Sequence, residues 1–211
     1  MLASLAHPRI VALIDAFEDE RGGWIVLERL DGNLGGYLKY HPRSILRARA
    51  DLAEDLLAAV DTVHRIDYVH NDIRPRNVFV QQSQAGPAGR SVFKLGDFGD
   101  SFKLPGPEET KRVGLGGWSH APEGYDPERY RPYGKTVDIY KSALVLLSAR
   151  LGTTINLTKT EVLNATAQKL ALKARGPDSK VLAKALDLEP GRRFQSAKEF
   201  LLALQEAYAG R

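Results

Sequence analysis

One segment of the sequence, TVDIYKSALVLLSARL at 136–151, is apolar on nearly every side. A helix that is apolar all round is buried inside a protein, so this segment predicts a central buried helix. Its apolar run is too short to cross a bilayer, which requires about 20 residues. With 43% apolar residues among 211, the chain can build a real core, as one large domain or two small ones.

Two pairs of short apolar runs predict hairpins. The runs RIVALIDAF at 9–17 and WIVLERL at 24–30 are rich in β-branched and aromatic residues, and EDERGG between them has the charges and glycines of a turn. The runs VFV at 78–80 and VFKLG at 92–96 flank a polar stretch that contains glycine and proline. This second pair predicts a hairpin with an enlarged tip.

The rest of the chain is predicted to be helical or irregular. From 45 to 66, apolar residues recur at steps of three and four, which predicts one amphipathic helix. Residues 100–135 are rich in glycine, proline and charge and predict a long irregular segment. Near the C-terminus, SAKE predicts a capping box in which Ser196 caps the last helix and Glu199 reaches back. The predicted order is therefore hairpin, helix, hairpin, long loop and helices, with the first hairpin in a small lobe.

Composition excludes several classes of function. The chain has no cysteine, which excludes disulfides, thiolate metal sites and cysteine nucleophiles, and we expect a cytoplasmic protein. The net charge of +4 comes from scattered basic residues, so we expect no nucleic-acid partner. His7, Pro8 and Arg9 interrupt the N-terminal apolar stretch, which is unlike a signal peptide, and we expect a soluble protein with no membrane partner.

The segment YVHNDIRPRNVFV at 68–80 contains candidate catalytic residues. Asp72 and Asn77 stand five positions apart in a bend that Pro75 restricts. An aspartate in such a loop can accept a proton from a hydroxyl nucleophile, and an asparagine carbonyl oxygen can bind magnesium. Arg74 could lie across a transferring phosphoryl group and offset its charge. Taken singly, the same residues are common turn formers.

Six further segments occur in a characteristic order: HPRIVALIDAFED, WIVLERLDGNL, KLGDFGDS, SHAPEGY, TVDIYKSA and LEPGRRF. Together with HNDIRPRN, which is similar to the catalytic loop H-R-D-x-K-x-x-N, they resemble the eukaryotic-type protein kinase family over nearly the whole chain. The resemblance implies an α+β, protein kinase-like fold, with a mostly helical large lobe and a truncated small lobe.

The resemblance also implies an activity. The chain would transfer the γ-phosphoryl group of ATP to a Ser or Thr hydroxyl of a protein substrate, with ATP and Mg2+ as cofactors. Asp72 would be the catalytic base and Arg74, in place of the usual lysine, would remain cationic beside the phosphoryl group. Asn77 and Asp97, the latter in Asp-Phe-Gly, would bind the magnesium ion.

The same family implies how the nucleotide would be held. Leu27 would be the gatekeeper of the adenine site. The backbones of Glu28 and Leu30 would face adenine, and Phe79, together with Leu30, would form an apolar floor beneath the base.

Other residues have architectural roles in the family. Leu13, His70 and Phe98 would stack as a regulatory spine that leans on Asp138, and Asp138 would bond back to the catalytic loop. Arg193 would pair with Glu123 of the Ala-Pro-Glu segment, out of contact with water.

The chain departs from the family pattern most strongly at its start. The glycine-rich loop, the strand lysine and the helix glutamate that position ATP precede HPRI in protein kinases, and these 211 residues do not supply them. We therefore expect an N-terminally truncated kinase-like domain over 1–211, with 1–30 as the remnant of the small lobe and hinge and 31–211 as the large lobe. This chain by itself is expected to transfer phosphate poorly or not at all.

Two substitutions bear on regulation and substrate. Asn71 replaces an arginine that receives the activation-loop phosphate, so the chain resembles non-RD kinases and is not expected to be switched by phosphorylation of that loop. Gly116 stands about where Ser/Thr kinases have a threonine, so the substrate class is blurred, and the expectation is no more than a lean toward Ser/Thr over Tyr substrates.

Two alternatives to a protein kinase enzyme are open. A pseudokinase that acts as a protein-binding module would account for the missing phosphate-binding elements. A small-molecule kinase of the choline or aminoglycoside type would account for the His-Asn-Asp sequence, although the Ala-Pro-Glu segment and the helix headed by Asp138 are foreign to such enzymes. The sequence leaves the oligomeric state open.

Overall fold

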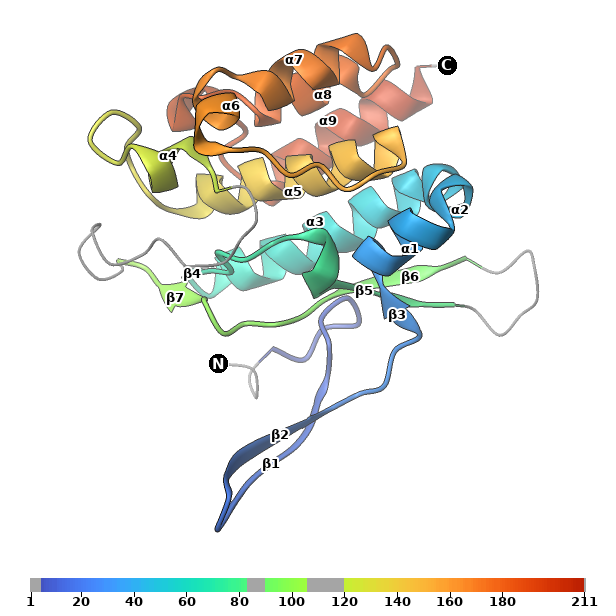
Figure 1. Ribbon diagram of the computed structural model, residues 1–211, viewed down its shortest axis with the longest axis vertical. Helices are drawn as coiled ribbons and strands as arrows, with labels where there is room; N and C mark the ends of the chain where they lie inside the picture. Colours follow the sequence, from blue (N-terminus) through green and yellow to red (C-terminus); the bar gives the residue numbers. More distant parts are fainter. Residues whose placement is uncertain (1–4, 83–89, 106–119, 211) are drawn as a thin grey trace.

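The central helix predicted from the sequence is α5, Lys135–Leu151, and its residues from 136 to 149 are all buried. In this computed structural model, which describes residues 5–82, 90–105 and 120–210, α5 lies between α3 (Arg49–Arg65) and α8 (Ser179–Ala185) and contacts both (Figure 1). Within those ranges, no helix is long and apolar enough to span a lipid bilayer.

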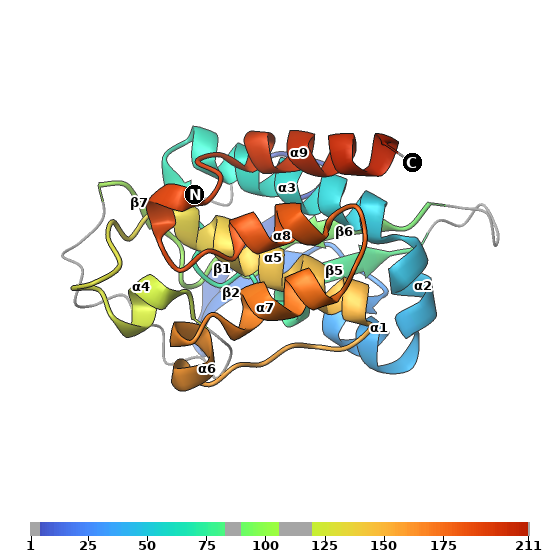
Figure 2. The same ribbon diagram turned by 90° about the horizontal axis from the view of Figure 1, so that it is seen from above.

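The other helices surround α5 in the body of the molecule (Figure 2). They are α1 (Leu34–Tyr40), α2 (Pro42–Arg47), α4 (Pro122–Tyr125), α6 (Lys159–Leu163), α7 (Thr166–Lys173) and α9 (Ala197–Ala209). The prediction of one helix over 45–66 was wrong, because the chain breaks at Ala48 into α2 and α3. No glycine or proline marks the break. It is made by packing, since α2 buries Ile45 and contacts the end of α5.

Among the described residues, three small antiparallel sheets complete the fold, which confirms the predicted α+β class. They pair β1 (Leu13–Asp19) with β2 (Gly22–Leu27), β4 (Tyr68–Val69) with β7 (Phe102–Lys103), and β5 (Val78–Gln81) with both β3 (Gly32–Asn33) and β6 (Val92–Leu95). The sheet of β3, β5 and β6 lies against α3 and brings the ends of β5 and β6 beside the bend that follows β4. Both predicted hairpins are therefore present.

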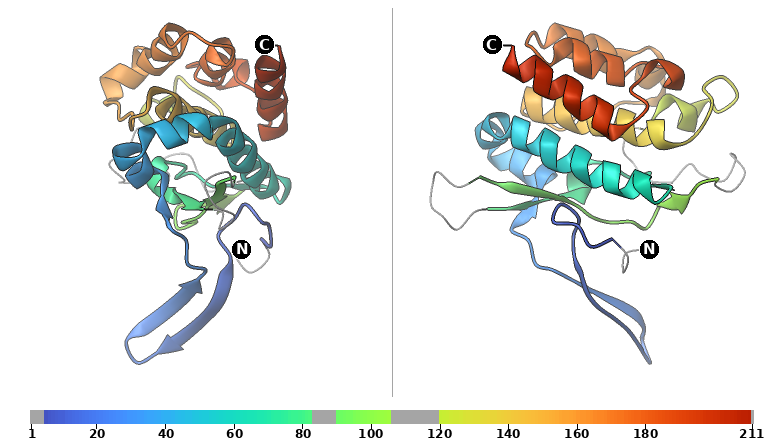
Figure 3. Two further views of the ribbon diagram at one scale, coloured as in Figure 1. Left: turned by 90° about the vertical axis from the view of Figure 1, so that its right-hand side faces the viewer. Right: turned by 180° about the vertical axis from the view of Figure 1, so that it is seen from behind.

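The first hairpin extends away from the helical body (Figure 3). Its first strand begins later than predicted, at Leu13 instead of residue 9, because Ile10 instead bridges to Leu95 in the sheet beneath α3. Its second strand begins earlier than predicted, at Gly22 instead of residue 24, and ends at Leu27 instead of residue 30. Both of its strands are largely exposed, and Ile14 and Ile25 are 65% and 62% exposed. An isolated two-stranded hairpin with apolar side chains in water is marginally stable.

The last helix begins as predicted, with one difference in its cap. The hydroxyl of Ser196 accepts a hydrogen bond from the backbone N–H of Glu199 at 3.1 Å. The carboxylate of Glu199, however, accepts from the N–H of Gln195 at 2.9 Å and not from that of Ser196. The Glu199 carboxylate thus bonds to the residue before the one that the predicted capping box requires. It still satisfies a backbone N–H group at the start of the helix.

Candidate functional site

The bend between β4 and β5 holds Asp72 and Asn77 in direct contact. A short 3-10 turn, Pro75–Asn77, closes the bend, and the N–H of Asn77 donates to the carbonyl of Arg74 at 2.9 Å. The side-chain Nδ2 of Asn77 donates to the carboxylate Oδ2 of Asp72 at 2.7 Å and to its backbone carbonyl at 2.9 Å. The proline-restricted bend therefore fixes one oxygen of the carboxylate.

The other carboxylate oxygen of Asp72 faces a cation. Nη1 of Arg74 lies 3.6 Å from Oδ1 of Asp72, and both side chains are partly exposed. This distance is too long for a hydrogen bond, so the guanidinium interacts with the carboxylate through its charge. The two oxygens of Asp72 therefore differ, because Oδ2 is held by a hydrogen bond from Asn77 and Oδ1 faces the Arg74 guanidinium.

Asp97 is brought to the same place by the pairing of β5 with β6. The N–H of Gly96 donates to the carbonyl of Asn77 at 3.0 Å, and Asp97 follows directly. Asp97 is exposed and has a φ of 61°, in the left-handed region. Left-handed backbone at a residue other than glycine is uncommon and is found at functional sites.

The donor set of this bend suits magnesium. Both side-chain hydrogen bonds of Asn77 use its Nδ2, which leaves its carbonyl oxygen outside them. Magnesium prefers one or two protein oxygens together with phosphate oxygens and water, and Asn77 and Asp97 offer an amide and a carboxylate oxygen. No group of three or more His, Cys, Asp or Glu side chains arranged to hold a metal ion is present in the described part of the chain.

Asp138, at the start of α5, anchors the bend from inside the core. It accepts the N–H groups of His70 and Asn71 at 2.8 Å each, as predicted, and Nε2 of His64 at 2.9 Å. Although burial raises the pKa of the Asp138 carboxyl, the hydrogen bond and charge of His64, together with the bond from His70, bring it below its usual value. Asp138 is therefore a buried carboxylate that holds the loop as an ion.

His70 links the bend to the Asp97 segment. Its ring stacks at a tilt on Phe98, with 4.6 Å between ring centroids, and its Nε2 lies 3.1 Å from the carbonyl oxygen of Gly96. Its Nδ1 accepts the N–H of Asp72 at 3.3 Å. Burial lowers the pKa of His70, which agrees with a neutral ring that donates from one nitrogen and accepts at the other. Leu13, the third predicted spine residue, is partly buried at the start of β1.

Of the predicted adenine residues, Leu27, Glu28 and Leu30 lie where β2 leads into the body, and Phe79 lies on β5. Leu27 ends β2 and is 42% exposed, whereas Leu30 and Phe79 are partly buried. The carboxylate of Glu28 accepts two hydrogen bonds from Nζ of Lys94, at 2.8 and 2.7 Å, and one from the N–H of Ala12 at 2.8 Å. Lys94 was not predicted, because its contact with Glu28 spans 66 positions in the sequence.

Phe79 packs where only glycine fits on the neighbouring strand. A Cβ atom on Gly96 would lie 2.9 Å from Cε2 of Phe79 and 2.7 Å from Cγ2 of Val11. Both distances are too short for real contacts. Gly96 thus sets how closely the predicted floor of the adenine site approaches the Asp97 segment.

Two further polar residues near the bend were not predicted. Nζ of the buried Lys141 donates to the carbonyl oxygen of Asn71, and the hydroxyl of Tyr133 donates to the Asn71 side chain at 2.6 Å. The one signal in the sequence was a lysine in the middle of a mostly apolar helix, three positions after Asp138. Gly116, the residue tied to substrate class, lies outside the described residues.

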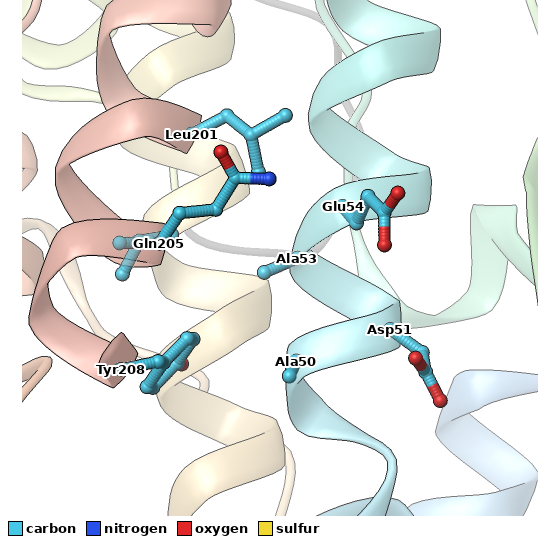
Figure 4. A pocket seen from close by; sticks show the side chains of 8 residues that line it. Ala50, Asp51, Ala53, Glu54, Leu201, Gln205 and Tyr208 are labelled. Atoms are coloured by element: carbon cyan, nitrogen blue, oxygen red, sulfur yellow. The ribbon is translucent and has the colours of Figure 1, made fainter. Parts of the chain in front are cut away.

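A hollow of about 220 Å³ lies elsewhere, between α3 and α9 (Figure 4). Its lining residues are Ala50, Asp51, Ala53, Glu54, Leu201, Leu204, Gln205 and Tyr208. None of them belongs to the bend, the Asp97 segment or the predicted adenine site. The hollow is therefore separate from the candidate site.

The sequence of this chain is similar to those of known protein kinases. A family model described as "Protein kinase domain" matches residues 1–202. The chain is 29% identical over 154 residues to the probable serine/threonine-protein kinase PknB of Lactococcus lactis, an alignment that covers 72% of this chain and 23% of that protein.

Two other relatives are of similar distance. The serine/threonine-protein kinase TIO of Arabidopsis thaliana is 29% identical over 157 residues, covering 72% of this chain and 11% of that protein. The serine/threonine-protein kinase US3 of human herpesvirus 1 is 30% identical over 150 residues, covering 69% and 29%. The matched region is thus less than a third of each of these three relatives.

Proposed function

Because this chain belongs to the eukaryotic-type protein kinase family, we propose that it transfers the γ-phosphoryl group of ATP to a Ser or Thr hydroxyl of a protein. The lean toward Ser and Thr is supported by relatives that are named as serine/threonine-protein kinases. In this proposal, residues 1–30 form the small-lobe strands and the hinge, and residues 31–211 form the large lobe. We propose that the protein acts in the cytoplasm.

The observation that carries the proposal is the contact between Asp72 and Asn77 beside the Asp97 segment. Asn77 holds Oδ2 of Asp72 with its side chain and accepts the N–H of Gly96 with its backbone. In the proposed reaction, the oxygen of the substrate hydroxyl attacks the γ-phosphorus of ATP, the bond from that phosphorus to the β–γ bridging oxygen breaks, and ADP leaves. Oδ1 of Asp72 accepts the proton of the hydroxyl. Arg74 offsets negative charge that develops on the transferred group.

Asn77 and Asp97 would hold magnesium, which supplies positive charge to the phosphate oxygens when bound. The neutral His70 keeps the Asp97 segment in register with the bend through Gly96. Leu27, Glu28, Leu30 and Phe79 would form the adenine site. The chain's own residues thus divide into a base, a charge-offsetting arginine and oxygen ligands.

The test is transfer of radiolabelled phosphate from ATP to a generic basic protein, with the protein in its full natural length. We expect Asp72→Asn to lower transfer by a factor of about 100 or more. The matched control is Asp61→Asn on α3, whose carboxylate pairs with Arg65 at 2.7 Å and not with the site. Equal transfer by the wild type and Asp72→Asn would contradict the proposal.

A pseudokinase that binds a protein partner is the second candidate. It is favoured by the exposed apolar side chains of the hairpin β1–β2, among them Ile14, Phe17, Trp24 and Ile25. The absence of transfer in a protein that carries a glycine-rich loop and a strand lysine, with the Asp72 bend intact, would favour this second candidate.

A further inference from the structure

Two charged residues of α5 hold the same point of the backbone. Asp138 and Lys141 are three positions apart, which places them on one face of the helix. Asp138 accepts the N–H of Asn71, and Nζ of Lys141 donates to the carbonyl oxygen of Asn71. The central helix therefore holds Asn71 by both polar groups of its backbone.

The backbone of Asn71 adopts a special conformation at this point. Its φ of 66° is in the left-handed region, which asparagine adopts more readily than other residues with a side chain. Its side chain is also held, since Oδ1 accepts from Tyr133 at 2.6 Å and Nδ2 donates to the carbonyl of Asp100 at 3.3 Å. Contacts with both the backbone and the side chain of Asn71 thus hold the bend in one conformation.

Burial of the charged Lys141 side chain is energetically unfavourable by itself. Lys141 is 4% exposed, and a buried ammonium group is unfavourable unless charges and hydrogen bonds compensate it. Burial lowers the pKa of Lys141, whereas the carboxylates of Asp72, Asp138 and Asp100 oppose that effect, and Arg74 adds to it. Among these charges, Asp72 has the largest influence on the ammonium group, so Lys141 lies within the electrostatic reach of the proposed base.

The carbonyl that Lys141 contacts belongs to the peptide bond between Asn71 and Asp72. We propose that Lys141 is a positioning residue for Asp72, which fixes this peptide from inside the core and thereby sets the direction of the Asp72 carboxylate. The catalytic part of this inference rests on the proposed function of Asp72, but the contact itself does not. A displaced catalytic group can lower a rate about a hundredfold even when the displacement is about 1 Å.

The first test measures backbone hydrogen exchange by NMR in the chain itself. In Lys141→Met, which keeps the length of the side chain but removes the donor, we expect the amides of Asn71 and Asp72 to exchange about tenfold faster relative to those of α3. The control is Ser142→Ala on the same helix, because Ser142 is buried and its hydroxyl has no hydrogen-bond partner among the residues that the structure describes. Unchanged exchange at the bend, or an equal rise throughout the protein, would overturn the proposal.

A second measurement needs no variant and therefore stands even if Lys141→Met does not fold. In the wild type, a scalar coupling across the hydrogen bond should join Nζ of Lys141 to the carbonyl carbon of Asn71. Detection of this coupling supports the contact on which the proposal depends, and its absence in a spectrum that shows the Lys141 Nζ signal rules the contact out.

The third test separates positioning from folding by kinetics in the full natural protein. We expect Lys141→Met to lower kcat by about tenfold or more with the KM for ATP nearly unchanged, and Lys141→Arg to recover part of the loss. A change confined to KM, or no recovery by arginine in a folded variant, would contradict positioning. If the wild type itself shows no transfer, the proposed function fails, while the exchange and coupling measurements still decide the role of Lys141 in holding the bend.

Discussion

The guanidinium of Arg193 and the carboxylate of Glu123 form two parallel hydrogen bonds, each 2.8 Å long, and neither side chain is exposed. The predicted pair is therefore confirmed. Arg193 also donates to the backbone carbonyls of Thr136, Asp187 and Leu188, so it ties the start of α5 to the chain that follows α8. Glu123 in turn connects this junction to α4.

We expect the substitution of Arg193 and the substitution of Glu123 to lower the free energy of unfolding by different amounts. Arg193→Ala leaves a buried carboxylate and three carbonyls without their donor and should lower the free energy of unfolding by roughly 3 to 5 kcal/mol. Glu123→Ala should cost less, because Arg193 keeps its three carbonyl acceptors. Denaturant unfolding measures both, with Arg131→Ala as control, since Arg131 pairs with Glu128 on the surface and should contribute about 0 to 1 kcal/mol. Equal small effects for all three variants would contradict a buried pair.

Gly96→Ala should disturb the predicted adenine site. The added methyl group would meet Val11 and Phe79 at distances below 3 Å, so Phe79 must move or the strands must separate. We expect a loss of about 1 to 3 kcal/mol in unfolding free energy and weaker binding of ATP, measured by denaturation and calorimetry. Gly191→Ala is the control, because a Cβ there would lie more than 4 Å from every described residue except Gly191 itself and its two chain neighbours. A variant as stable as the control would show that the close approach is relieved at no cost.

The buried His70 should make stability depend on pH. Because burial lowers its pKa in the folded protein, the unfolded chain takes up a proton first as the pH falls below about 6.5. The contribution of neutral His70 is therefore complete above that pH and is lost as the pH falls toward the lowered folded value. We expect His70→Gln, which keeps a donor but does not titrate, to lose less stability between pH 7.5 and pH 5.5 than the wild type, as denaturant unfolding at each pH would show. Parallel curves for the two proteins would count against this role.

Lys94→Met should loosen the segment that would face adenine. Lys94 makes two short bonds to the Glu28 carboxylate, and both side chains are mostly shielded from water. Removal of these two hydrogen bonds should raise the Kd for ATP several-fold, since the Glu28 side chain would no longer be anchored by Lys94 and its backbone would be less well fixed. Calorimetric titration measures this, and Lys198→Met on the exposed face of α9 is the control. The same Kd in Lys94→Met and the control would show that the ion pair does not position the segment.

The sequence by itself determined the elements whose cause is local. The all-round apolar pattern of 136–151 required a buried helix, and the turn residues between apolar runs required the two hairpins. The contact of Asp72 with Asn77 is also local, because Pro75 restricts a bend of only a few residues. The cap by Ser196 follows from the chemistry of a single turn.

The tertiary structure decided what depends on segments far apart in the chain. The break at Ala48 has no local signal and arises because α2 packs on α5 while α3 continues along it. The contact of Lys141 with Asn71 spans 70 positions, and the pairing of Lys94 with Glu28 spans 66. Such contacts form only when packing brings the segments together, since charge and spacing along one chain do not specify which distant partner a buried cation meets. The residues proposed for chemistry, and the Asp138 that anchors their loop, were thus predictable from the sequence, whereas the supporting contacts of Lys141 and Lys94 could be identified only in the fold.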